Sequence, residues 1–304
     1  MRVSLANRSL MALLRLLRVK SWANAAALRV VVKLSRTTGA ARPSRRLHGL
    51  CRIDSAKAHG DLVHWLMPRE GNAPFQLLYL HGGAYSIDIG FVHWQLIESL
   101  IHKTGCAATV PLYPLAPENG WKQALGSVLT HYRELTAQIP AARIVIMGDS
   151  AGGGLALALA QAAQAAGLPQ PGHIVLLSPW LDLTMSDPAT LAHQAHDPVL
   201  KPEAALAAAR MYAGDLPLED PRISPIYGAV RGLAPVTVLT GTRDMLNPDA
   251  RRFAARMLSE GQAIELVEHA GMVHAWMLLP MPEAHLAREQ IIAILMRQFG
   301  QAQV

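Results

Sequence analysis

The chain has 304 residues, of which 51% are hydrophobic and 16% charged, so it can bury a large core. No stretch of about 18 uncharged apolar residues occurs, which excludes a membrane-spanning helix. With no secretory signal in view, the two cysteines, Cys51 and Cys106, are expected to be free thiols in a reducing, cytoplasmic compartment.

The net charge of +6 is concentrated at the amino-terminal end. Residues 1–46 hold eleven Lys and Arg residues and no acidic residue, so the rest of the chain carries 17 basic against 22 acidic residues. A nucleic-acid-binding protein usually places its basic residues on the folded body, interleaved with aromatic residues. The distribution therefore predicts no nucleic-acid partner and marks a distinct amino-terminal segment.

Residues 4–34 are predicted to form one or two amphipathic helices, because apolar residues such as Leu10, Leu14 and Leu17 recur at helical spacing. Three roles are open for this basic segment. It can form a helical cap over an active site, a peripheral anchor on anionic lipid through residues 1–40, or a solvated helix without a function.

Beyond a linker at residues 39–46, apolar β-forming runs alternate with helical stretches, as in α/β proteins. This alternation predicts a mostly parallel sheet covered by helices on both faces, with the active site at the carboxyl ends of the strands. A Pro/Asp-rich region at 182–235 contains one predicted helix. The predicted strands are 61–67, 75–80, 106–112, 143–147, 173–177, 236–240 and 264–267, and the predicted helices are 91–103, 121–138, 155–166, 202–213, 248–259 and 282–299.

Residues 144–154 have the pattern of a strand, a tight turn with Ser150 at its apex, and a helix. Gly148 and Gly152 fit a turn in which the strand and helix backbones pass too close for side chains. Free N–H groups at the start of the following helix can stabilise a developing oxyanion. The stretch therefore predicts that Ser150 is a nucleophile, with an incidental serine in a Gly-rich turn as the alternative.

A serine hydroxyl needs a general base, and the base needs a group that orients it. For this kind of turn the acid and then the histidine follow the serine along the chain. Downstream of Ser150, the predicted strand 236–240 leads into a loop with Asp244, and strand 264–267 leads into a loop with His274. Both loops are expected at the same end of the sheet as the serine, so the three residues are predicted to form a catalytic triad.

Other residues compete for these roles. His269 lies two residues past its predicted strand and is expected to be structural, whereas His274 lies in a loop that can reach over the sheet edge. Asp249 is expected in the first turn of a helix, where an acid favours the helix dipole. Asp149 is expected to be a hydrogen-bonded structural acid. The other competitors for the acid are Asp182 and Asp197.

The apolar run before His81 predicts a strand that ends in a Gly-rich loop. Glycines allow backbone N–H groups to point at a carbonyl oxygen without a Cβ in the way. The expected oxyanion donors are Gly83 and Ala84, with Gly82 as a further candidate, together with Ala151. His81 is expected to hold the loop by hydrogen bonds rather than to act as a base.

Five blocks of sequence occur in order: HGGAY at 81–85, YPLAPE at 113–118, GDSAGG at 148–153, GTRD at 241–244 and GMVH at 271–274. Together they resemble the bacterial hormone-sensitive-lipase-like esterases, the GDSAG-type members of the α/β-hydrolase superfamily. The resemblance covers roughly residues 70–300. It implies an α/β-hydrolase fold, with a mostly parallel eight-stranded sheet flanked by helices, under a helical cap.

By the same resemblance, residues 47–304 are the catalytic domain, and the cap consists of residues 1–46 and an insertion at about 182–220. The resemblance also implies hydrolysis of carboxylic esters of short or medium acyl chains, with no cofactor and no metal. Three positions depart from the family pattern and bear on substrate preference rather than on the triad. They are Ala84 in place of the third glycine of the HGGG motif, Pro114 in place of an arginine, and Met245 in place of a proline.

The sequence thus predicts a serine hydrolase that cleaves small-molecule esters through an acyl-enzyme on Ser150. The alternatives are a deacetylase, amidase or acyltransferase with the same triad, a lipase anchored to lipid, and a non-catalytic binding protein on this scaffold. The chain is expected to be a monomer or a homodimer, with the strand at 264–267 as a pairing edge. Candidate pocket residues are Trp22, Tyr85, Trp180, Met185, Met211 and Tyr212.

Overall fold

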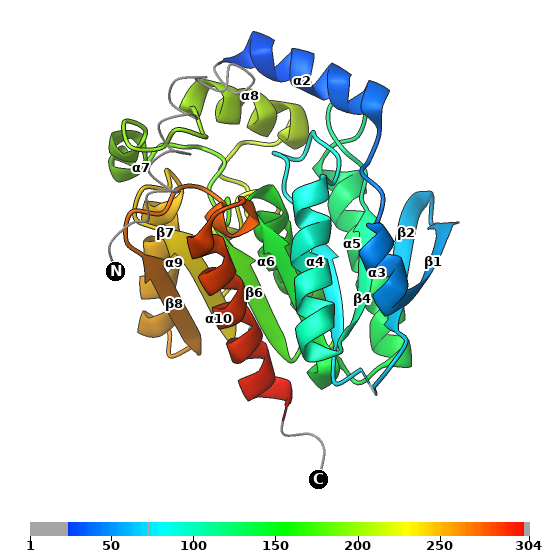
Figure 1. Cartoon of the computed structure of the whole chain (residues 1–304). Helices are drawn as coiled ribbons and strands as arrows, with labels where there is room; N and C mark the ends of the chain where they lie inside the picture. The colour runs from blue at the N-terminus through cyan, green and yellow to red at the C-terminus, as the bar shows by residue number, and fades with distance from the viewer. Residues whose placement is uncertain (1–23, 72, 301–304) are drawn as a thin grey trace.

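A single eight-stranded sheet crosses the molecule, which a computed structural model describes over residues 24–71 and 73–300 (Figure 1). The strands are β1 (Cys51–Ala58), β2 (Asp61–Pro68), β3 (Gln76–Leu80), β4 (Ala107–Leu112), β5 (Ile144–Asp149), β6 (His173–Leu177), β7 (Val236–Gly241) and β8 (Ile264–His269). Their order is β1-β2-β4-β3-β5-β6-β7-β8. β2 pairs antiparallel with β1 and β4, and the other neighbours pair in parallel. The predicted mostly parallel, eight-stranded sheet is confirmed.

Seven strands lie where the apolar runs predict them, within two residues at either end. The sequence does not predict β1, in which Cys51 is the buried residue and most other side chains are exposed or half-buried. An edge strand of this kind lacks the apolar alternation by which a strand is recognised. β8 forms the opposite edge of the sheet.

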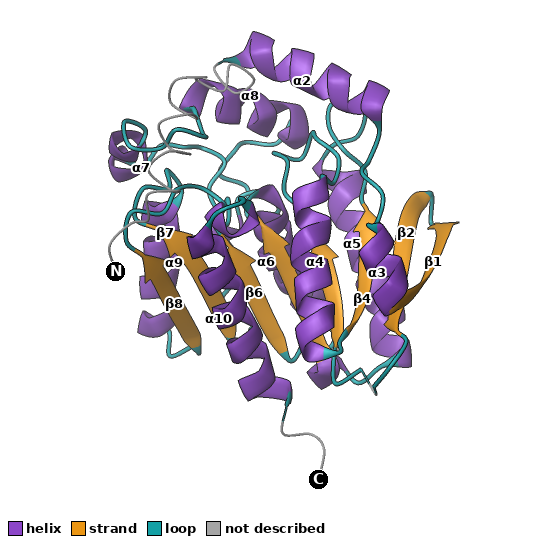
Figure 2. Cartoon of the chain, viewed as in Figure 1, coloured by secondary structure: helices purple, strands orange, loops and turns teal. Residues whose placement is uncertain are grey.

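Side chains of successive strand residues enter two separate apolar cores. On β5, Ile144 and Ile146 face the core that contains α5 and α6, whereas Val145 and Met147 face the core that contains α4 and α10. This alternation follows from the two-residue period of a strand and covers the sheet on both faces (Figure 2). The helices of the two layers are α3 (Arg45–Leu50), α4 (Phe91–Thr104) and α10 (Pro282–Phe299) on one face, and α5 (Trp121–Gln138), α6 (Ala151–Ala165) and α9 (Asn247–Ser259) on the other.

Three further helices lie beyond the carboxyl ends of the parallel strands (Figure 1). They are α2 (Ala25–Thr38), α7 (Pro188–His193) and α8 (Pro202–Ala213). α2 packs against α8, and its residues Leu28 and Val32 are buried in the same core as Ala205 of α8. These helices cover the edge of the sheet at which the strand–helix loops meet.

The helix predictions at 121–138, 202–213 and 282–299 are confirmed with the same bounds. The predicted linker at 39–46 is wrong at its end, because Ser44 caps α3, which begins at Arg45. The short helix α7 is not predicted. The part of the predicted helix at 4–34 that precedes residue 24, and Trp22 with it, lies outside the described residues. Across residues 24–71 and 73–300, no helix has the length and apolar character needed to cross a bilayer.

Candidate active site

Ser150 occupies the sharp turn between β5 and α6. Its φ of 51° and ψ of −121° lie in a region that residues with a Cβ rarely adopt. The Ser150 N–H donates to the carbonyl oxygen of Leu177 at 2.9 Å, and its own carbonyl oxygen accepts the N–H of Trp180 at 2.8 Å. Hydrogen bonds on both sides therefore hold the strained residue in place.

Two glycines make this turn sterically possible. A Cβ on Gly148 would overlap the carbonyl oxygen of Gly152, and a Cβ on Gly152 would overlap the carbonyl oxygen of Leu80. The strand and the helix thus approach each other at backbone contact, as the sequence pattern predicts. Any side chain at either position would push α6 away from the sheet and move Ser150.

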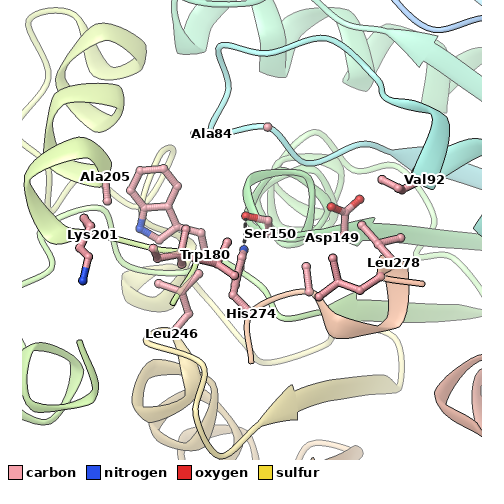
Figure 3. Close-up of a pocket in the computed structure, with 15 residues that line it drawn as sticks. Ala84, Val92, Asp149, Ser150, Trp180, Lys201, Ala205, Leu246, His274 and Leu278 are labelled. Carbon is pink, nitrogen blue, oxygen red and sulfur yellow. Dashed lines mark hydrogen bonds between the residues drawn. The ribbon is translucent and has the colours of Figure 1, made fainter. Parts of the chain in front are cut away.

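The side chains of Ser150, His274 and Asp244 form a continuous hydrogen-bonded row, of which Figure 3 shows the Ser150–His274 bond. His274 Nε2 lies 2.9 Å from Ser150 Oγ, and His274 Nδ1 lies 3.0 Å from Asp244 Oδ1. Asp244 is fully buried, and its Oδ1 also accepts the N–H of Leu246 at 2.9 Å. The structure therefore brings together three residues that are far apart in the sequence, at the carboxyl ends of β5, β7 and β8.

The pKa of His274 is raised above its ordinary value. Burial opposes protonation of the ring, but the negative charge and hydrogen bond of Asp244 outweigh it, and Asp197 and Asp149 act in the same direction. The same charges therefore favour an imidazolium at this position.

The competing residues have other partners. His269 Nε2 lies 2.8 Å from Gln290 Oε1 of α10. Asp249 lies in the first turn of α9, and both it and Asp182 pair with Arg252, at 3.3 and 2.6 Å. Asp197, by contrast, is buried close to Asp244.

The Gly-rich loop after β3 lies beside Ser150. Gly83 has a φ of 123°, Ala84 a φ of 51° and Tyr85 a φ of 58°, so the loop has positive φ at three successive residues. A Cβ on Gly83 would overlap the carbonyl oxygen of Ile87. Gly83 and Ala84 line the cavity that contains Ser150, whereas the N–H of Gly82 donates to Asp149 Oδ1 at 3.0 Å.

Asp149 and His81 hold this loop through hydrogen bonds to Gly82. Asp149 Oδ1 also accepts the hydroxyl of Tyr79 at 2.6 Å, and its Oδ2 lies 3.4 Å from His93 Nε2. Burial opposes ionisation of Asp149, but His93 and the hydrogen bonds outweigh it and lower the pKa of the carboxyl. Burial lowers the pKa of His81 to about 4, so this ring is neutral and donates through Nδ1 to the carbonyl oxygen of Gly82 at 2.7 Å.

A cavity of about 270 Å³ opens beside Ser150 and His274. Its lining is almost entirely apolar, with Trp180 and Leu246 on one side of the Ser150–His274 pair and Leu278 on the other (Figure 3). Among the predicted pocket residues of the described chain, Trp180 lines this cavity, and the others do not. The lining residues that the sequence did not predict are Val92, Val199, Leu200, Lys201, Ala205, Leu246, Ala275, Leu278 and Leu279.

The other predicted pocket residues have structural positions. The rings of Tyr85 and Tyr212 stack at 3.7 Å between centroids, and Met185 is buried in the core that contains residues of α6 and α8. In residues 24–71 and 73–300, no group of three or more His, Cys, Asp or Glu side chains could hold a metal ion. The polar groups that the structure brings together beside the cavity are a serine, a histidine and a carboxylate.

Comparison with known proteins assigns this chain to a family. Residues 77–278 match the family model described as an alpha/beta hydrolase fold, and the chain belongs to that family. It is 32% identical to an acetyl-hydrolase of Streptomyces hygroscopicus over 70% of this chain and 72% of the relative. It is 31% identical to an esterase of Acinetobacter venetianus over 73% of this chain and 75% of the relative.

Solved structures agree with the sequence relatives. An esterase of the bacterial hormone-sensitive lipase family superposes with a TM-score of 0.83 at 26% identity, covering 98% of this chain and all of that chain. The resemblance drawn from the five sequence blocks and the α/β-hydrolase fold that it implied are therefore confirmed.

Proposed function

We propose that this protein is a serine carboxylesterase. The observation that carries the proposal is the hydrogen-bonded row from Ser150 through His274 to Asp244, beside an apolar cavity. Relatives named as an esterase and an acetyl-hydrolase support the reaction class. The substrate is a small carboxylic ester, and the reaction uses the side chains and backbone amides of this chain.

In the first half of the reaction, Ser150 Oγ attacks the ester carbonyl carbon while His274 Nε2 takes the hydroxyl proton. Asp244 holds the ring with Nδ1 protonated, so that Nε2 is the free base. The tetrahedral intermediate then collapses, and the imidazolium delivers its proton to the departing alcohol. In the second half, water attacks the acyl-enzyme by the same proton transfers and releases the carboxylic acid.

The oxyanion of both intermediates is held by the backbone N–H groups of Gly83, Ala84 and Ala151. Ala151 begins α6, where N–H groups are free and the helix dipole favours negative charge. Gly82 is left out of the proposed oxyanion hole, because its N–H already donates to Asp149. Fixed donors of this kind lower the barrier because they are oriented before the charge develops.

The cavity limits the substrate to short or medium acyl chains. Its volume of about 270 Å³ lies at the lower end of ligand pockets, and its walls are apolar. An acetyl or butyryl ester fits these dimensions and this chemistry. A second candidate function is a deacetylase with the same triad and mechanism, which is favoured by the acetyl-hydrolase among the relatives.

The proposal includes the division of the chain into a cap, residues 1–46 with about 182–220, and a catalytic domain, residues 47–304. It is supported by Arg36 of α2, which bonds to Glu118, Asp88 and the carbonyl oxygen of Ala116 near the oxyanion loop. Deleting residues 1–40 tests the cap against peripheral membrane contact. Loss of ester turnover supports the cap, whereas intact turnover with lost binding to anionic vesicles supports an anchor.

We also propose a cytoplasmic location, supported by the free, buried thiols of Cys51 and Cys106. A monomer and a homodimer paired through β8 are the two oligomeric states proposed. Size-exclusion chromatography with light scattering decides between them.

The test of the function is Ser150→Ala, assayed on p-nitrophenyl acetate and p-nitrophenyl butyrate. We expect turnover to fall by roughly 10⁴-fold or more, because removing the nucleophile stops acylation. A folded Ser150→Ala protein with undiminished turnover would overturn the proposal. Matched melting curves for the two proteins establish that the variant is folded.

A further inference from the structure

We propose that Asp197 is a positioning residue for the triad. Its carboxylate holds the loop that carries Asp244 and, at the same time, the chain segment that forms one wall of the substrate cavity. The inference rests on the esterase function proposed above. It concerns a residue outside the Ser150–His274–Asp244 row.

The hydrogen bonds of Asp197 divide between two segments. Its Oδ2 accepts the N–H of Met245, the residue directly after Asp244, at 2.9 Å. Its Oδ1 accepts the N–H groups of Val199 at 2.7 Å and Leu200 at 3.2 Å. One side chain therefore joins the acid loop after β7 to the segment that precedes α8.

The loop that carries Asp244 is held at Met245 by this contact. Asp244 Oδ1 accepts from His274 and Leu246, while its buried Oδ2 has no hydrogen-bond partner in the described part of the chain. Asp244 is thus oriented through one oxygen and through the backbone of its own loop. Asp197 fixes that backbone at Met245, so it fixes the distance at which Asp244 meets His274.

The wall segment depends on the same carboxylate. Val199 and Leu200 line the cavity beside Ser150, as does Lys201 at the start of α8. The backbone N–H groups of Val199 and Leu200 bond to Asp197, which also bonds to Met245. Asp197 is therefore a common anchor for the shape of the cavity and the position of Asp244. Replacing the anchor is expected to disturb both.

Electrostatics supports the geometry. Asp197 is 2% exposed, and the charged groups that face it are Asp244 and His274. Burial and the charge of Asp244 raise the pKa of Asp197 to about 6, against the opposing effect of His274 and the backbone N–H donors. Above that pH its negative charge adds to the charge of Asp244 in raising the pKa of His274.

The test compares Asp197→Asn with Asp249→Asn in the full chain. Asparagine keeps the shape but offers one acceptor oxygen, so either Met245 or the Val199–Leu200 pair loses its acceptor. Asp249 is a matched control, because it is another buried carboxyl of raised pKa, and it faces Arg252.

We expect Asp197→Asn to lower kcat on p-nitrophenyl acetate by roughly 10- to 100-fold per active site, since a small displacement of a triad member has effects of that size. The acid limb of its kcat/KM profile is expected to move to lower pH, because a negative charge beside His274 is gone. Asp249→Asn is expected to keep the wild-type kcat within about 2-fold and the wild-type acid limb. A loss of folding alone would lower the number of active sites without moving the limb.

Fluorophosphonate titration of Ser150 gives the number of active sites in each protein. If Asp197→Asn matches the control in kcat per active site and in the position of its acid limb, the inference is overturned. The esterase function is judged separately: it stands if the wild-type protein is labelled by the fluorophosphonate and hydrolyses the ester. If Asp197→Asn does not fold, Asp197→Glu decides. It keeps the charge but moves the carboxylate by one methylene group, so kcat per active site is expected to fall while the acid limb stays in place, and a wild-type kcat per site overturns the inference.

Discussion

Asp149 Oδ1 accepts the N–H of Gly82 at 3.0 Å, which ties the residue before Ser150 to the Gly-rich loop after β3. The same oxygen accepts the hydroxyl of Tyr79, which lies on the neighbouring strand β3. The turn at Ser150 and the Gly-rich loop are thus one bonded unit. Movement of either one alters the distance between Ser150 Oγ and the backbone N–H groups of Gly83 and Ala84, which are the proposed oxyanion donors.

Replacing Asp149 with alanine is therefore predicted to affect both stability and turnover. Gly82 N–H and the Tyr79 hydroxyl would lose their acceptor while buried, at a cost of about 1–3 kcal/mol for each group. We expect the free energy of unfolding to fall by roughly 2–5 kcal/mol and kcat to fall about 10- to 100-fold. Urea unfolding and ester assays measure the two effects. Asp54→Ala on the exposed edge strand β1 is the control, and equal behaviour of the two variants would contradict the prediction.

The raised pKa of His274 predicts a specific pH dependence. The ring acts as a base only when neutral, so kcat/KM is expected to fall as the pH is lowered through a pKa above the ordinary value of 6.5. The effect on stability has the opposite sign. Because the folded pKa lies above the unfolded one, the imidazolium adds stability that is fully present below about pH 6.5 and is lost as the pH rises through the folded value. An acid limb with its midpoint well below 6.5 would contradict this account.

Ala84→Gly is predicted to relax the site. Ala84 has a φ of 51°, where glycine has no steric penalty, and it lines the cavity. We expect the melting temperature to be unchanged or higher and kcat/KM for bulkier esters to rise several-fold relative to p-nitrophenyl acetate. Ala84→Val, with a branched side chain at the same φ, is expected to lower both values. A uniform change for small and bulky esters would show that the methyl group does not limit the cavity.

Arg36→Ala is predicted to loosen α2. The guanidinium bonds to Glu118, Asp88 and a backbone carbonyl, and it is half-buried. We expect the free energy of unfolding to fall by about 1 kcal/mol, less at high salt, because half-exposed ion pairs are screened. Arg29→Ala on the exposed side of the same helix is the control. A salt-independent loss, or an equal loss in the control, would count against the ion-pair explanation.

The spacing of apolar residues along the sequence predicted most of the strands and helices. A buried parallel strand is a continuous apolar run, and a surface helix has an apolar stripe. Helices such as Trp121–Gln138 and Pro282–Phe299 therefore have the predicted bounds. β1 and α7 escaped prediction, since an exposed edge strand and a six-residue helix carry little apolar pattern. Their existence follows from pairing with β2 and from capping by Asp187, which are contacts made only in the folded chain.

The hydrogen-bonded row of Ser150, His274 and Asp244 was predictable because each residue follows an apolar strand at the same sheet edge. The cavity wall was not, since Val92, Leu246 and Leu278 are apolar residues at helix ends, where sequence does not separate core from pocket. The sequence also did not predict the hydrogen-bond partner of the Gly82 N–H, which was a candidate oxyanion donor. Only the structure shows that its amide is bonded to Asp149.

The most direct test of the account is to identify the residue that carries the covalent intermediate. The protein is treated with a fluorophosphonate and digested, and the modified peptide is sequenced by mass spectrometry. We expect a single adduct on Ser150 that His274→Ala suppresses strongly, because the hydroxyl is activated through the ring. An adduct on another residue, or turnover that survives complete labelling of Ser150, would contradict it.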